Sequence, residues 1–189
     1  MITGAEKLDK ASIVAVGEWN VPIKIWMEKG AIKTEKLIEN EEGWWNSIQS
    51  GDLDNDGDLD LVLGNIGLNT QFKANENEPA SLYFDDFDKN GNVDFFMNYY
   101  IQGKSYPAYT RDEVVEQIPM LRKKYITYKA YSTATIQDFF EADVLKKATF
   151  KEIKETKSII LENQNGKFIK HELPHEAQYA PIYAILITD

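Results

Sequence analysis

The sequence predicts a mainly β chain that carries a helical insertion. An acidic loop followed by a short apolar run occurs twice, which is typical of a loop that enters a buried strand. Between residues 109 and 153 the apolar residues instead recur with helical spacing. The chain has 189 residues, of which 43% are hydrophobic and 12% aromatic, and this composition excludes a disordered tail.

The first acidic loop, Asp52–Asp60, places carboxylates at alternate positions around Gly57. Calcium takes roughly six to eight oxygen ligands at about 2.3 to 2.6 Å, so a short loop must turn alternate side chains inward and fold sharply. We therefore expect a calcium site whose side-chain ligands are Asp52, Asp54, Asp56 and Asp60, with the backbone carbonyl of Asp58 at position seven. A solvated acidic loop that holds no ion is the alternative.

The loop differs from an EF-hand. An EF-hand has a glutamate at position twelve and a helix on each side. Position twelve here is Leu63, and the run from Leu61 to Gly64 reads as a strand. The sequence therefore predicts a calcium loop between two strands, with its last acid at position nine.

The second acidic loop, Asp86–Asp94, repeats this spacing. Its expected ligands are the side chains of Asp86, Asp88, Asn90 and Asp94 and the backbone carbonyl of Asn92. Because Asn90 offers a neutral oxygen, we expect the second site to bind calcium more weakly.

Parts of the same repeat occur at both ends of the chain. Ile13–Gly17 matches the strand after the first loop, but the positions before it lack the ligands. Ile182–Thr188 matches the strand that precedes a loop, and Asp189 stands where the next first ligand would stand. We expect the chain to begin inside one repeat and to end at the threshold of another.

These motifs resemble the FG-GAP or VCBS-type repeats of integrin α-like β-propellers, and more closely the bacterial branch related to cartilage acidic protein. Besides the two loops, the matching segments are Gly17–Trp19, Pro22–Trp26, Gly64–Asn69, Tyr99–Lys104, Leu161–Asn163 and Gly166–Phe168. The resemblance implies a partial β-propeller of about two to three blades. It also implies that calcium stabilises the blade edges, whereas ligands bind on the faces.

The expected organisation follows from these patterns. Residues 1–108 form propeller blades with both calcium loops, residues 109–153 form the helical insertion, and residues 154–189 return to blade strands. Complete propellers close a ring of roughly four to eight blades, which protects their sheet edges. We therefore expect a segment of a longer propeller, which calcium, the helical insertion or self-association through open sheet edges could stabilise.

The helical insertion has its own local signals. Val114, Val115, Ile118 and Leu121 share one helical face, and acids precede them at a helix start. Pro119 should kink or restart this helix. A second helix is expected through residues 136–140 with Thr133 or Thr135 as its cap, and a third through residues 141–147. Strand character resumes at residues 157–162, and Asn165-Gly166 predicts a hairpin.

Charge and cysteine content restrict the partners. The chain has 31 acidic and 21 basic residues, and a net charge of −10 disfavours a nucleic-acid partner. No apolar run predicts membrane insertion by this segment, and the absence of cysteine is compatible with any redox compartment. Calcium loops of moderate affinity fill at millimolar calcium, so they and the family resemblance predict an extracytoplasmic location.

Two tyrosines are the candidate ligand-binding residues. Tyr106 and Tyr109 flank Pro107 at the start of the insertion, whereas the tryptophans are expected mainly in the core. His171 and His175 are separated by Pro174, which breaks the helix that a shared metal site would need. We expect a non-catalytic segment for adhesion or for recognition of an extracellular protein or polysaccharide. The alternative is a propeller-borne, glycan-active enzyme with structural calcium.

Overall fold

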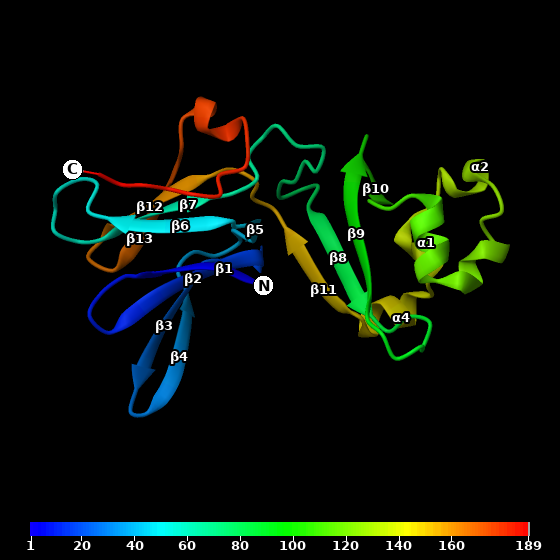
Figure 1. The fold of residues 1–189 in the computed structure, drawn as a ribbon, viewed down its shortest axis with the longest axis horizontal. Helices are drawn as coiled ribbons and strands as arrows, with labels where there is room; N and C mark the ends of the chain where they lie inside the picture. The colour runs from blue at the N-terminus through cyan, green and yellow to red at the C-terminus, as the bar shows by residue number, and fades with distance from the viewer. Residues whose placement is uncertain (189) are drawn as a thin grey trace. The chain divides into compact units, whose positions relative to one another are not determined.

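The computed structural model describes residues 1–188 and shows three antiparallel sheets and a group of short helices (Figure 1). Strands make up 40% and helices 16% of the structure, which confirms the mainly β prediction. The chain forms two compact units. The first unit comprises Met1–Gln71 and Ile153–Asp189, and the second comprises Phe72–Glu152. Asp189, the expected first ligand of a further loop, lies outside the described residues.

The first sheet of the first unit is a meander of consecutive strands. Its order is β1 (Ile2–Lys7), β2 (Ser12–Asn20), β3 (Ile23–Glu28) and β4 (Ala31–Lys36), and the short β5 (Gly43–Trp44) also pairs with β2. Lys29 and Gly30 close the β3–β4 turn with φ of 50° and 80°, a conformation that glycine adopts readily. β2 buries Val14 and Val16 and contains the expected strand Ile13–Gly17.

The second sheet of the first unit joins two distant parts of the chain. Its order is β13 (Lys167–Glu172), β12 (Ile159–Gln164), β7 (Asp60–Gly64) and β6 (Ser47–Gly51). In sequence the whole second unit lies between β7 and β12. All five residues of β7 are buried, as expected for an apolar run at the centre of a sheet. Asn165 and Gly166, with φ of 55° and 88°, form the expected hairpin turn between β12 and β13.

One apolar core serves both of these sheets. Trp45, Leu61, Leu63, Ile159 and Leu161 are fully buried in it. These residues come from both chain segments of the first unit. Burial of apolar side chains therefore favours the association of the two segments.

The second unit contains a sheet covered by helices. The sheet order is β10 (Lys104–Pro107), β9 (Asp94–Ile101), β8 (Ala80–Asp85) and β11 (Thr149–Ile153). β11 corrects the expected extent of the insertion, because residues 149–153 form a strand and the helices end at Lys147. Residues 149–153 form a strand because they pair with the edge of β8, and the Tyr83–Phe150 ring contact at 4.9 Å supports this pairing. The local sequence does not indicate this partner.

The helices follow most of the local signals. They are α1 (Arg111–Gln117), the 3-10 helix η1 (Pro119–Lys123), α2 (Tyr128–Tyr131), α3 (Ile136–Phe139) and α4 (Ala142–Lys147). Thr110 caps α1 in a capping box with Glu113, and Pro119 restarts the chain as η1. The four apolar residues of the expected helical face are buried. Thr135, rather than Thr133, caps α3, and α2 was not expected from the sequence.

The last described segment differs from the expectation of a blade strand. After the short 3-10 helix η2 (His175–Gln178), residues 179–188 form neither helix nor strand. Ile182 still donates its N–H to the Asn65 carbonyl at 3.0 Å and accepts from the Ser47 hydroxyl at 2.8 Å. These isolated bonds do not make a strand ladder, so the Ile182–Thr188 prediction is wrong for the described chain. None of the described helices has the length and apolar content needed to cross a membrane.

Candidate metal sites

The two acidic loops occupy equivalent places in two different sheets. The first connects β6 to β7, and the second connects β8 to β9. Gly51 pairs with Asp60 in one hairpin, and Asp85 pairs with Asp94 in the other. The repeat read from the sequence is therefore also a repeat of strand register.

In the first loop, backbone amides turn inward onto the carboxylates. Asp52 accepts from the amides of Asp56 at 3.2 Å and Gly57 at 3.0 Å. Asp54 also accepts from the Asp56 amide at 3.2 Å, and Asp56 accepts from the Asp58 amide at 2.8 Å. These bonds turn the acidic side chains towards the backbone of the loop, while Asp52, Asp54 and Asp56 stay exposed.

The second loop reproduces these four bonds position by position. Asp86 accepts from the amides of Asn90 and Gly91, both at 2.9 Å. Asp88 accepts from the Asn90 amide at 3.1 Å, and Asn90 accepts from the Asn92 amide at 2.8 Å. The shared backbone path therefore does not depend on whether position five is Asp or Asn.

The same two positions have positive φ in each loop. At position four Asn55 and Lys89 have φ of 63° and 60°, and at position six Gly57 and Gly91 have φ of 94° and 88°. Glycine adopts this region with little strain, whereas a lysine in it is uncommon. The unfavourable residue at Lys89 shows that the loop as a whole imposes the turn.

The position-nine acids anchor the end of each loop to its beginning. Asp60 and Asp94 are 2% and 4% exposed, and they accept from the amides of Leu53 at 2.8 Å and Phe87 at 3.0 Å. In each loop, positions one, three and nine offer carboxylate oxygens within 4.8 Å of one another; these residues are Asp52, Asp54 and Asp60, and Asp86, Asp88 and Asp94. Oxygens on opposite sides of one calcium ion lie about 5 Å apart, so this spread fits a single ion.

Loss of hydration and the crowding of like charges raise the pKa of one acid in each loop. Loss of hydration, together with the charges of Asp56 and Asp60, raises the pKa of Asp54. Burial, followed by the charges of Asp88 and Asp86, raises the pKa of Asp94. A bound cation would relieve both effects, because it stabilises the ionised carboxylates.

The remaining expected ligands lie differently. The carboxylate of Asp56 is not part of the close group in its loop. The side chain of Asp58 accepts from the Asn165 amide at 3.0 Å and so faces the β12–β13 turn. The expectation that Asp58 and Asn92 serve through their backbone carbonyls stays a prediction.

Residues outside the loops support the position-nine acids. The backbone amide of Asn163 donates to Asp60 at 2.8 Å, and its side chain donates to the Leu59 carbonyl at 3.2 Å. In the second unit the Gln117 side chain of α1 donates to the carbonyl of Phe95, next to Asp94, at 3.3 Å, and it opposes the rise in the pKa of Asp94. Sequence reasoning missed both, since Asn163 follows Asp60 by 103 residues, although Asn163 lies in a segment that carries the family resemblance.

The two candidate ligand-binding tyrosines do not form one exposed pair. Tyr106 is half-buried beside a hollow of about 350 Å³, with the Lys104 ammonium 5.1 Å from its ring centre. Tyr109 packs against the core of the second unit, with its ring 6.0 Å from that of Phe96, and burial raises the pKa of Tyr109. The expectation of an exposed contact therefore applies to Tyr106 better than to Tyr109.

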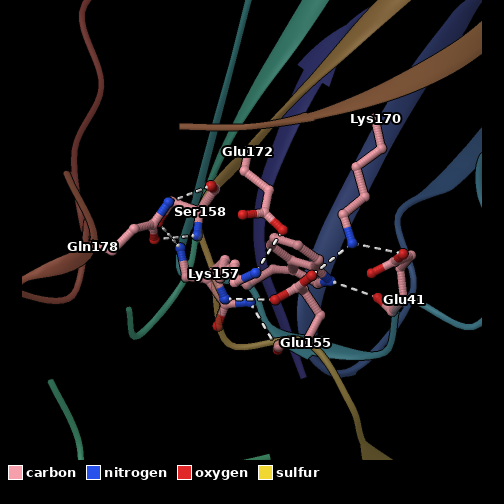
Figure 2. Close-up of polar contacts among 9 residues, drawn as sticks. Glu41, Glu155, Lys157, Ser158, Lys170, Glu172 and Gln178 are labelled. Atoms are coloured by element: carbon pink, nitrogen blue, oxygen red, sulfur yellow. Dashed lines mark hydrogen bonds and ion pairs between the residues drawn. The ribbon is translucent and has the colours of Figure 1, made fainter. Parts of the chain in front are cut away.

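A second polar cluster lies where the chain returns to the first unit (Figure 2). The Lys170 ammonium contacts Glu41 at 2.7 Å and Glu155 at 2.6 Å. Burial raises the pKa of Glu41. Burial opposes the charge of Lys170, but its bonds to Glu155 and Glu41 outweigh this effect and raise its pKa. The lysine thus holds two acids from different chain segments together.

Next to this cluster, Gln178 is almost fully buried and pairs with the backbone of Ser158 in both directions. It accepts from the Ser158 amide at 2.8 Å and donates to the Ser158 carbonyl at 2.9 Å (Figure 2). Asn65 donates to the Glu155 carbonyl at 3.0 Å. The returning segment is therefore held in place by satisfied polar groups as well as by the apolar core.

Comparisons of the chain with protein-family models, with curated proteins and with solved structures found no match. The resemblance to FG-GAP or VCBS repeats stays a prediction that depends on the motifs.

Proposed function

We propose that this chain is a calcium-binding β-repeat segment whose loops Asp52–Asp60 and Asp86–Asp94 each bind one Ca²⁺. The observation that carries the proposal is the position-by-position identity of the hydrogen bonds in the two loops. Each loop also offers three carboxylate oxygens at a spacing that fits one ion. A chance acidic surface has no reason to repeat this geometry.

The calcium ions have a structural role in this proposal. Each loop closes an antiparallel strand pair and gathers like charges at its end. A bound ion neutralises these charges and links the first and last residues of the loop. It therefore stabilises the hairpin, and the ion itself carries out no reaction.

The sheets support a segment of a β-propeller. The β1–β4 sheet is an antiparallel meander, and the β13-β12-β7-β6 sheet has four antiparallel strands with the second unit inserted between β7 and β12. Four antiparallel strands are the form of a propeller blade. We propose that such blades present a face that recognises an extracellular protein or polysaccharide. Open sheet edges such as β4, whose residues are all exposed, offer a route to association with further blades or copies.

Calorimetric titration tests calcium binding directly. Two ions are expected, the second bound more weakly because Asn90 replaces an acid. With about 1 mM calcium and a dissociation constant of about 10 µM, one site would stabilise the fold by about 2.7 kcal/mol. EDTA should then lower the melting temperature by several degrees.

Substitutions at position three assign the two sites. Asp54→Ala should remove one binding event and Asp88→Ala the other, and each variant should lose part of the calcium-dependent stabilisation. Unchanged melting in EDTA together with no heat of calcium binding would refute the proposal. A glycan array followed by a product assay tests recognition, and turnover would favour the glycan-active enzyme instead.

A further inference from the structure

The turn between β12 and β13 contacts the first calcium loop, although it lies about a hundred residues away in sequence. Its two turn residues, Asn165 and Gly166, follow directly on Asn163 and Gln164 at the end of β12, and we call this segment the Asn163–Gly166 turn. Asn163 donates its amide to the Asp60 carboxylate at 2.8 Å and its side-chain N–H to the Leu59 carbonyl at 3.2 Å. Asn165 donates its amide to Asp58 at 3.0 Å. Three consecutive loop residues are therefore held by one turn.

The contact with Asp60 bears directly on the proposed metal ligand. Asp60 is 2% exposed, and its two oxygens accept from different parts of the chain. Leu53 donates to one from within the loop, and Asn163 donates to the other from β12. Because Asn163 donates through its backbone amide, the orientation of this carboxylate depends on how the backbone of β12 is held.

The side chain of Asn163 is itself held in place. Its oxygen accepts from the Gly166 amide at 2.7 Å, and Asn163 is 8% exposed. The turn is thus a rigid support rather than a mobile neighbour. Groups that orient a metal ligand typically change metal affinity by about 10- to 100-fold when they are removed.

We infer that the Asn163–Gly166 turn is a positioning element for the first calcium site, so that calcium binding and the pairing of β12 with β7 stabilise each other. The inference rests on the proposed function. Coupling between two events is reciprocal: if the turn strengthens calcium binding, calcium must strengthen the attachment of the turn.

This coupling would stabilise a strand pairing that has a high entropic cost in this chain. Strands β7 and β12 are separated by the whole second unit, and the entropic cost of joining two segments grows with the length of chain between them. Calcium at the first site would act on this distant pairing. The second loop belongs to the other compact unit, so the second site is not expected to depend on the turn.

A titration in a single-site background tests the inference. Asp88→Ala removes the second site and leaves the first. In that background Asn163→Leu keeps the backbone amide that donates to Asp60, but it removes the side-chain bonds to Leu59 and Gly166 that hold this amide in place. The variant should weaken calcium binding by about 10- to 100-fold. Asn75→Leu is the matched control: the same replacement removes side-chain bonds to the amides of Asn77 and Glu78, which lie outside both calcium loops, so affinity should be unchanged.

Hydrogen exchange on the unsubstituted chain provides a second measurement that does not depend on a variant that folds. Calcium should slow exchange in β12 as well as in the loop, and Asp54→Ala should abolish the effect in β12. Calcium uptake with unchanged affinity in Asn163→Leu, or protection confined to Asp52–Asp60, would overturn the inference alone. No calcium uptake by the unsubstituted chain would overturn the proposed function and the inference together.

Discussion

Replacing Lys170 by methionine should lower the free energy of unfolding, because two neighbouring acids then lose their counter-ion. Methionine retains the length and apolar stem of the side chain, but it leaves Glu41 and Glu155 without their shared cation. Removal of one partner from a buried ion pair costs about 3 to 5 kcal/mol. The side chains of Lys170 and Glu41 remain 27% and 21% exposed, so solvent screening reduces the expected loss to about 1 to 3 kcal/mol at neutral pH.

The loss should depend on pH in a defined direction. Burial already raises the pKa of Glu41, and removal of Lys170 should raise it further. A carboxyl group whose pKa is higher in the folded state destabilises the fold when ionised, so the deficit of the variant should shrink as the pH falls through that raised pKa. In the unsubstituted chain the raised pKa of Lys170 contributes stability that is lost as the pH rises through it, and Lys170→Met should lack this alkaline loss.

Urea unfolding followed by tryptophan fluorescence measures the free energy of unfolding of the first unit, which contains Lys170. All four tryptophans lie within Met1–Gln71, which belongs to the same unit as Lys170. Lys157→Met is the matched control, because the Lys157–Glu172 pair is more exposed, at 32% and 52%, and should be worth less than about 1 kcal/mol. A Lys170→Met deficit no larger than that of the control, or one independent of pH, would refute the reasoning.

Three further predictions concern the second unit. Phe96→Ala should destabilise it by about 3 to 5 kcal/mol in chemical unfolding, because this fully buried ring leaves a cavity, and a loss below about 1 kcal/mol would contradict the described core. Thr110→Ala should lower the free energy of unfolding, followed by circular dichroism, by about 1 kcal/mol, because it removes the cap of α1. In the unsubstituted chain the bonds to Thr110 lower the pKa of Glu113, so the stability that they contribute should be lost as the pH falls through that pKa. Tyr109→Ala should lower the melting temperature, whereas Tyr106→Ala should change it less and should weaken any ligand bound beside the Tyr106 hollow; equal melting losses would show that both are core residues.

Local sequence patterns predicted the features whose physical cause lies in neighbouring residues. The acid spacing of Asp52–Asp60 implied an inward-turned loop, because side chains two apart can all accept amides from one turn. Asn165-Gly166 implied a hairpin since both residues tolerate positive φ. Pro119 implied a restarted helix because it lacks an N–H, and the structure shows a 3-10 helix there.

Other features depend on strand partners or packing partners that are distant in the sequence, so the local pattern does not predict them. Residues 149–153 were placed with the helices, yet the free edge of β8 makes them a strand. Ile182–Thr188 has strand composition, but it forms no ladder in the described chain. Tyr109 was expected at the surface beside Tyr106, but packing against Phe96 holds it at the core.

By itself, the sequence determined a mainly β chain with two matched acidic loops, because turns, caps and alternating carboxylates are encoded within a few adjacent residues. The tertiary structure alone decided which strands pair across the inserted unit and which residues support the loops. Asn163 contacts Asp60 only because the apolar core brings β12 against β7, and such contacts depend on the whole fold rather than on sequence spacing.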